Sequence, residues 1–171
     1  GFMGFEYDYV LTITSAGDPD AVQYVSDTTS FNAGNTLFIM PFDGVASDTA
    51  PFSVRAFAAA GGLQSIPDSR FPPSVQFVNT SIDLGTSDIY DDEELTSRIV
   101  AGHAYGDVSE EISIAAETNL FLYTPAGDTG AVTLESSLPA SGGLRYRVVA
   151  AGVAGSLQTF SLVPDGAGVD T

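Results

Sequence analysis

Acidic residues crowd into one short stretch of the chain, where metal chemistry is the first possibility to test. They are Asp83, Asp88, Asp91, Asp92, Glu93 and Glu94. Calcium takes about six to eight oxygen ligands, which closely spaced carboxylates and backbone carbonyls can supply. However, the stretch contains no Asp-x-Asp-x-Asp-Gly loop. The alternative is that Asp88 lies in a strand and that residues 91–94 form a solvated turn of an acidic protein. Both interpretations stay open, so the metal-binding residues are unknown at this point.

Residue spacing gives little support for catalysis. The single histidine, His103, lies between predicted strands, and no Gly-x-Ser-x-Gly elbow accompanies it. A glycosidase needs two carboxylates across a cleft, but no spacing among the acidic residues singles out such a pair. Asp18 and Asp20, on either side of Pro19, are typical of a turn. We therefore predict that the chain is not an enzyme, with no catalytic residues and no cofactor.

Composition excludes several other classes of protein. The 171 residues include 22 acidic residues and five arginines but no lysine and no cysteine, and the net charge is −17. Without cysteine there is no disulfide, zinc–thiolate site or thiol nucleophile, and without lysine there is no Schiff base or P-loop. The negative charge repels nucleic acids and anionic membranes, and no apolar run is long enough for a transmembrane helix. This composition is typical of a protein outside a bacterial cell, either secreted or on its surface.

The apolar pattern predicts an all-β fold. Alternating, β-branched and aromatic runs recur along the chain, separated by Gly, Pro, Asp and Asn at intervals typical of sandwiches and barrels. The predicted strands cover residues 7–14, 21–25, 36–42, 52–58, 75–79, 88–90, 108–114, 119–124, 132–138, 144–150 and 157–163.

An internal repeat predicts two domains. Residues 12–24 align without gaps on residues 122–134, and both segments contain Ala-Gly-Asp and Ala-Val. Further matches place residues 32–39 over 140–147 and residues 64–68 over 161–165, with about 11 extra residues in the first copy. Gly17 and Gly127 are expected to adopt positive φ, with Asp18 and Asp128 making turn hydrogen bonds.

The repeat and a pair of prolines define the predicted domain boundary. The segment 68–73 ends in Pro72-Pro73, which favours an extended linker. We therefore expect residues 1–70 to be the C-terminal part of a first repeat that carries an insertion. Residues 71–171 would form a complete second repeat with a short tail.

The second repeat resembles an uncharacterised immunoglobulin-like domain family, often in tandem, of bacterial exported and cell-surface proteins. The resemblance rests on residues 74–92, on Tyr123–Asp128 and on Arg145–Gly152. Ile82, Leu84 and the acidic run depart from the family's usual residues. The resemblance implies tandem immunoglobulin-like antiparallel β-sandwiches, the first one incomplete, and implies no activity. Within it, Asn79-Thr80-Ser81 is a glycosylation sequon that we interpret as the turn after the first strand.

Alternation also predicts the core of the second repeat. We expect seven or eight strands around Val75, Phe77, Leu120, Leu122, Val132, Leu134, Tyr146, Val148 and Phe160. Arg145 and Arg147 share the opposite, outer face.

The first repeat lacks a counterpart for about 37 residues of the second, because 53 residues separate Ser74 from Gly127 whereas 16 precede Gly17. Without those opening strands a sandwich leaves apolar surface and a strand edge open to another chain. The alternative is that the missing strands belong to the same, longer polypeptide.

These observations lead to three hypotheses for function. The first is a structural or adhesive extracellular protein, such as a filament or surface-array subunit, whose copies assemble by strand complementation. The second is a carbohydrate-binding or calcium-stabilised accessory module of a larger secreted protein, with a glycan or calcium as partner. The third is a hydrolase with a carboxylate pair.

Overall fold

The structure is a computed structural model that describes residues 6–32, 36–43, 52–59 and 63–162. Within these ranges the chain forms fifteen strands and no helix, which confirms the predicted all-β class. The described residues divide into two compact units. One comprises residues 6–72 with the turn Ser141–Gly143, and the other comprises residues 73–140 and 144–162. The chain passes from the first unit to the second between Pro72 and Pro73.

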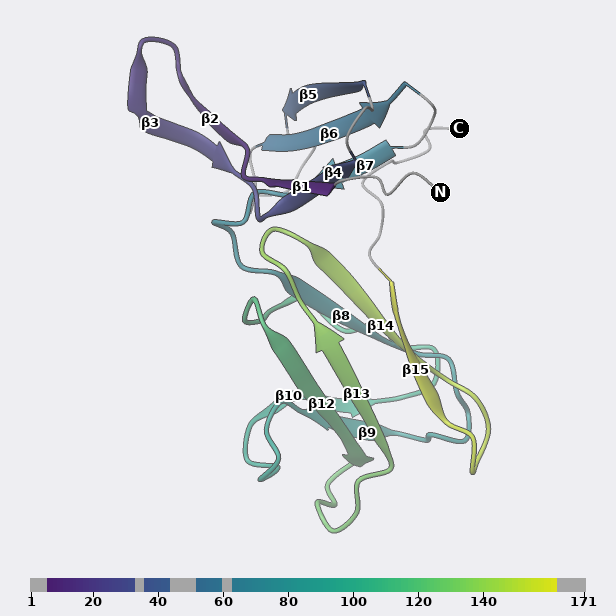
Figure 1. Cartoon of the computed structure of the whole chain (residues 1–171). Helices are drawn as coiled ribbons and strands as arrows, with labels where there is room; N and C mark the ends of the chain where they lie inside the picture. The colour runs from purple at the N-terminus through teal and green to yellow at the C-terminus, as the bar shows by residue number, and fades with distance from the viewer. Residues whose placement is uncertain (1–5, 33–35, 44–51, 60–62, 163–171) are drawn as a thin grey trace. The chain divides into compact units, whose positions relative to one another are not determined.

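The second unit is a sandwich of two four-stranded sheets (Figure 1). Its strands are β8 (Ser74–Asn79), β9 (Ser87–Tyr90), β10 (Arg98–His103), β11 (Ile112–Ser113), β12 (Thr118–Pro125), β13 (Leu134–Pro139), β14 (Arg145–Ala151) and β15 (Gln158–Leu162). One sheet has the order β10-β9-β12-β13, and the other has the order β11-β8-β14-β15.

Alternation along these strands fills the space between the sheets. Every second residue of β8 and β14 is buried, because successive side chains of a strand point to opposite faces. The ring of Phe77 on β8 meets that of Phe121 on β12 edge to face, with ring centroids 4.9 Å apart. Arg145 and Arg147 point outward as predicted. The structure confirms these predicted core residues: Val75, Phe77, Leu134, Tyr146 and Val148.

Of the other predicted core residues, Leu122 is buried but outside the cluster between the sheets, and Leu120, Val132 and Phe160 are not core residues. In β12, Phe121 and Tyr123 enter the core, so Leu120 and Leu122 point to the other face of the sheet, where Leu122 is still buried. A shift of one residue exchanges the two faces of a strand, and four successive apolar residues leave that choice open. Val132 lies before β13 and Phe160 lies on the outer face of an edge strand. They are 41% and 52% exposed.

The sequence predicted an antiparallel sandwich, but one pair of strands in this unit is parallel. β8 and β14 pair in parallel, with Phe77 opposite Val148, while all other pairs of strands in this unit are antiparallel. A parallel pair needs a long connection between its strands, and here the connection is made by β9 to β13.

The first unit has smaller sheets and a smaller core. Its strands are β1 (Glu6–Tyr9), β2 (Thr12–Ser15), β3 (Asp18–Val25), β4 (Thr29–Asn32), β5 (Leu37–Asp43), β6 (Phe52–Ala58) and β7 (Leu63–Ile66). They form two pairs, β1-β4 and β2-β3, and one three-stranded sheet, β5-β6-β7. Among the described residues, its buried cluster consists of four apolar side chains, Tyr24, Val54, Ala56 and Ile66. The buried cluster of the second unit has twelve. Less apolar burial means less stabilisation for this unit.

Strand register agrees with the internal repeat. Ile13 of β2 lies opposite Tyr24 of β3, and in the second unit Tyr123 of β12 lies opposite Leu134 of β13. In the alignment of the two repeats, Ile13 corresponds to Tyr123 and Tyr24 corresponds to Leu134. The tyrosine of the pair therefore lies on the second strand of the hairpin in the first unit and on the first strand in the second unit. Gly17 and Gly127 have φ of 81° and 77°, as predicted for equivalent turns.

The aspartates of these turns also behave alike. Asp18 Oδ1 accepts a hydrogen bond from the Asp20 N–H at 3.1 Å, and Asp128 Oδ1 accepts one from the Gly130 N–H at 2.7 Å. Each is an Asx turn, in which the side chain bonds to the backbone two residues further on. Both predicted turn hydrogen bonds are therefore present.

The insertion of the first copy contributes a strand. β14 pairs directly with β15, whereas β6 lies between β5 and β7, which are their counterparts by sequence (Figure 1). β6 spans most of the predicted extra residues, and its Val54 and Ala56 belong to the buried cluster. The insertion therefore replaces the β14–β15 type of pairing with a three-stranded sheet.

Candidate functional site

The acidic stretch does not gather into one site. Asp88 is buried on β9, whereas Asp91, Asp92, Glu93 and Glu94 lie beyond the end of that strand. Asp92 accepts hydrogen bonds from its own turn, from the N–H groups of Thr96 and Ser97 at 3.0 and 2.9 Å. Among the described residues, no three His, Asp or Glu side chains lie where they could hold a metal ion together.

Asp88 instead ties three segments of the second unit together. Its Oδ1 accepts the Gly102 N–H at 2.8 Å, and its Oδ2 accepts the Gly127 N–H at 3.0 Å and Nη1 of Arg98 at 2.8 Å. Burial opposes ionisation, but these donors outweigh it and hold the pKa of Asp88 below its ordinary value. All of these donors belong to the chain itself, so the geometry is that of a structural carboxylate.

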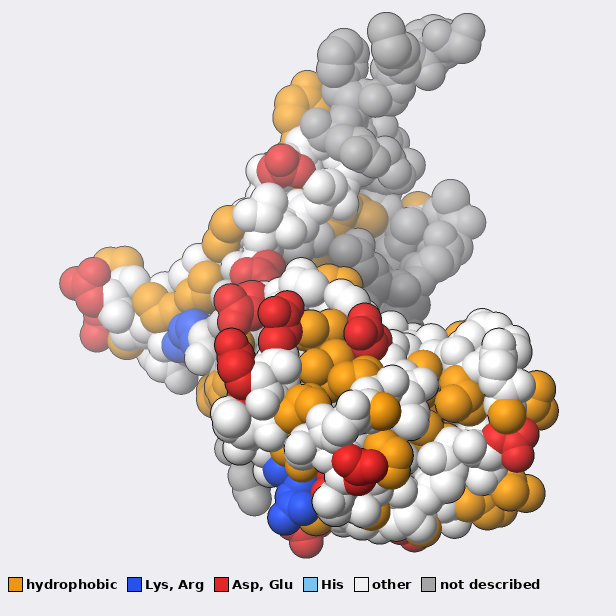
Figure 2. Space-filling view, turned by 90° about the horizontal axis from the view of Figure 1, so that it is seen from below, with side chains coloured by type: hydrophobic (Ala, Val, Ile, Leu, Met, Phe, Trp, Pro, Cys, Tyr) orange, Lys and Arg blue, Asp and Glu red, His pale blue; other side chains and the backbone are white. Residues whose placement is uncertain are grey.

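A shallow groove of about 480 Å³ lies beside the acidic turn. Asp91, Glu93 and Glu117 line it together with Asn119 and Leu120. Acidic side chains are common on the face of the molecule seen in Figure 2, and basic ones are few. Because these carboxylates are part of a generally acidic surface, the groove does not define a particular ligand.

His103 ends the edge strand β10 and is 3% exposed, which is unsuitable for a general base that must reach substrate. Its Nε2 has no hydrogen-bond partner within the described part of the chain. Burial lowers the pKa of His103, and the charge of Asp107 opposes that shift. The imidazole is therefore a packed, neutral group.

The sequon asparagine is also unavailable to solvent. Asn79 is completely buried, and its Nδ2 donates to the carbonyls of Gly85 at 3.1 Å and His103 at 3.4 Å. Its Oδ1 accepts the Ser81 N–H at 3.0 Å. A glycan cannot be attached to this amide in the folded unit, and the segment is the turn that the sequence predicts.

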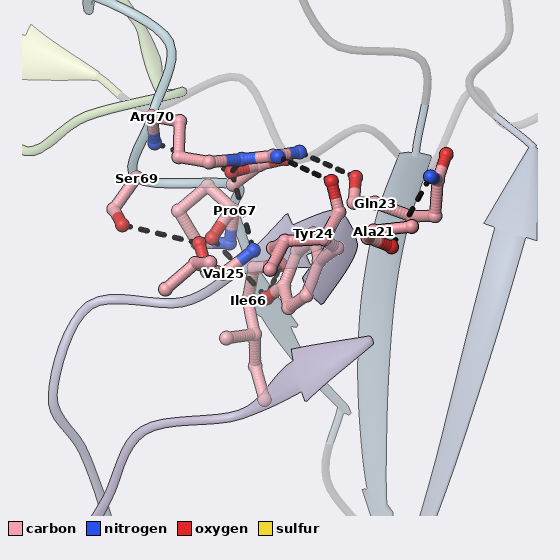
Figure 3. A network of polar contacts seen from close by, with 10 residues as sticks. Ala21, Gln23, Tyr24, Val25, Ile66, Pro67, Ser69 and Arg70 are labelled. Atoms are coloured by element: carbon pink, nitrogen blue, oxygen red, sulfur yellow. Dashed lines mark hydrogen bonds and ion pairs between the residues drawn. The ribbon is translucent and has the colours of Figure 1, made fainter. Parts of the chain in front are cut away.

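A polar network fastens the end of the first unit to β3 (Figure 3). The Ser69 N–H donates to the Val25 carbonyl at 2.8 Å, and Arg70 Nη1 donates to the Val22 carbonyl at 2.9 Å. Arg70 also pairs with the buried Asp68. Burial opposes ionisation of Asp68, but Arg70 and the Val25 N–H outweigh it and lower its pKa. The first three residues of the predicted linker are therefore anchored to the first unit.

Tyr24 of β3 also belongs to this network. Its hydroxyl donates to the carbonyls of Ile66 at 2.9 Å and Pro67 at 3.2 Å, where β7 ends (Figure 3). Burial, with repulsion from Asp68 as a smaller cause, raises the pKa of Tyr24. The phenol is therefore a hydrogen-bond donor that holds the end of β7 against β3.

The edge of β5 is the most unusual feature of the first unit. Among the described residues β5 pairs with β6 alone, yet Phe38, Ile39 and Met40 are 58%, 44% and 41% exposed. Consecutive residues of a strand lie on opposite faces, so apolar side chains on both faces of β5 are partly exposed at this edge. An exposed, apolar edge strand is a template for pairing with another chain.

Backbone geometry defines which groups this edge offers. The Thr36 carbonyl accepts the Ala59 N–H at 3.0 Å, so the even-numbered residues of β5 bond to β6. Odd-numbered residues, Ile39 and Pro41 among them, direct their backbone groups away from β6. Proline in a strand is found where its missing N–H faces an open edge, and Pro41 fits that position.

Edge strands of soluble proteins are usually protected by charge, proline, bulges or short length. β13 carries Glu135, β10 has an irregular register with β9, and β11 has two residues. β5 has Pro41 and a single charge, Asp43 at its end, whereas β15 has neither a charge nor a proline. β5 and β15 are thus apolar edge strands with little or no charge, in a chain whose net charge is −17.

Sequence reasoning did not single out Phe38, Ile39 and Met40, although a signal was present. The segment 37–42 is an uncharged apolar run that contains a proline, in a chain where acidic residues are frequent. Such a run predicts a strand but not which of its edges is paired.

A scan of protein-family models gave no match to this chain, and neither did a search of curated proteins. In the described residues no helix is long and apolar enough to cross a membrane.

Proposed function

We propose that this chain is a non-catalytic structural protein of the bacterial exterior, whose copies assemble by strand addition at the first unit. We also propose that each unit is an immunoglobulin-like repeat, as the sequence resemblance implies. The function requires no cofactor and no catalytic group. It requires a stable body, which the second unit provides, and an edge that accepts a strand.

The observation that carries the proposal is the open edge of β5. The strands of the first unit pair only among themselves within the described residues, but the apolar side chains of Phe38, Ile39 and Met40 on β5 are 41–58% exposed. Besides β5, Tyr7 and Tyr9 of β1 are about half exposed. Strand addition would cover such surface and pair the backbone groups of the edge in one step.

The test is the size of the purified chain, measured by light scattering after gel filtration and by negative-stain electron microscopy. We expect oligomers or filaments whose size increases with protein concentration. Ile39→Lys places a charge on the open edge and is expected to leave single chains. Ile82→Lys, at a residue 72% exposed in the second unit, is the matched control and should assemble normally.

A wild-type chain that remains monomeric at every concentration would contradict the proposal. Equal assembly of both lysine variants would show that β5 is not the interface.

A further inference from the structure

We infer that the strand added to β5 is β15 of a second copy of this chain. The inference rests on the proposed assembly and names its donor. β15 is the last strand of its sheet and pairs with β14 alone among the described residues. It is uncharged, and its Phe160 and Leu162 are 52% and 54% exposed. β5 and β15 are therefore both apolar edge strands with little or no charge, one on each unit.

Hydrogen-bond direction shows how these edges would meet. The carbonyls of Leu144 and Ala150 accept N–H groups of Ser74 and Thr80, so the even-numbered residues of β14 bond toward β8. Its odd-numbered residues bond toward β15, where Val149 lies opposite Phe160. In β15, Thr159 and Ser161 therefore direct their backbone groups outward.

Antiparallel pairing then determines which side chains face each other. Directly opposed residues either both bond across the pair or both bond away from it. Ile39 of β5, which bonds outward, must lie opposite an outward-bonding residue of β15. Phe38 and Met40 must lie opposite even-numbered residues, and Phe160 and Leu162 are the apolar ones. Because opposed side chains share a face, the four apolar side chains come together on one face of the joined sheet.

One register uses these groups most fully. It places Phe38 opposite Leu162, Ile39 opposite Ser161 and Met40 opposite Phe160. Ile39 and Ser161 exchange two hydrogen bonds, and the Thr159 N–H donates to the Pro41 carbonyl. Only the bond that Pro41 cannot donate is missing.

Pairing between two β5 strands is less favourable. A two-fold symmetric pair contains every residue twice, so it includes two Pro41 residues and loses two hydrogen bonds. The pairing of β5 with β15 joins different surfaces, and such a contact repeats from copy to copy into a filament or a closed ring.

The absence of cysteine from the native chain allows a direct test. Chains carrying Ile39→Cys and chains carrying Ser161→Cys are mixed under assembly conditions, oxidised and analysed on a non-reducing gel. The mixed disulfide should exceed that formed by Ile39→Cys with the exposed control Ile82→Cys by roughly tenfold or more, because pairing holds the two thiols together.

The outcomes separate this inference from the proposed function. Assemblies with a dominant product between positions 39 and 161 support it. Assemblies without that product, or with a product between two copies of Ile39→Cys in its place, overturn the donor strand and leave strand addition at β5 intact. If no assembly forms at all, both proposals are wrong.

Discussion

Replacing Phe77 with alanine should destabilise the second unit severely. The side chain is completely buried, and its ring packs edge to face on Phe121 and Tyr123, with centroids 4.9 and 6.2 Å away. A buried aromatic side chain removes about 150–250 Å² from water, at roughly 25 cal/mol per Å². Alanine keeps part of that burial, so we expect a loss of about 3–5 kcal/mol in the free energy of unfolding.

The assay for Phe77→Ala is urea unfolding followed by near-ultraviolet circular dichroism, which reports on the packed ring of Tyr123. Tyr105→Ala is the control, since it removes an aromatic ring from a position that is 58% exposed and outside the proposed interface, and it should cost less than about 1 kcal/mol. A loss below about 1 kcal/mol for Phe77→Ala, or equal losses for both variants, would refute the assigned core.

Three further predictions concern substitutions of single residues. Asp88→Asn should cost roughly 2–3 kcal/mol at pH 7, because an uncharged amide replaces the acceptor of Arg98 and two N–H groups, and urea unfolding measures the loss. Because the pKa of Asp88 is lowered on folding, its contribution is complete above the unfolded value of 3.8 and disappears as the pH falls through the folded value, so the wild type and Asp88→Asn should converge in acid. Burial lowers the pKa of His103, so the unfolded chain binds its proton first, and thermal stability should fall as the pH drops below about 6.5; a His103→Phe variant that folds should lack this step. Gly127→Ala and Gly17→Ala should each lose about 1–2 kcal/mol to left-handed strain, although no atom blocks the added methyl group, and equal stability to wild type would contradict the assigned turns.

The sequence predicted the fold class and the repeat because both depend on local patterns. Alternation located most strands, and the Ala-Gly-Asp turns appear with the expected φ. Local patterns did not determine which face of each strand points into the core. The run Leu120–Tyr123 is apolar throughout, so its inward residues depend on the register with β9 and β13.

The candidate site could not be predicted fully for a similar reason. The acidic stretch attracted attention by composition, but folding buries Asp88 and turns Asp92 toward its own backbone. The exposure of Phe38 and Phe160 depends on which strands are edges. Strand order is a property of long-range pairing, which neither propensity nor spacing encodes.

Sedimentation velocity of the wild-type chain over a series of protein and salt concentrations tests the proposed assembly most directly. Copies with a net charge of −17 repel each other, and salt shortens the screening length from about 10 Å at 0.1 M to about 3 Å at 1 M. Association through the apolar edges of β5 and β15 should therefore strengthen with both salt and protein concentration. A chain that sediments as a monomer under every condition, or assemblies that dissociate as salt is added, would contradict strand addition at these edges.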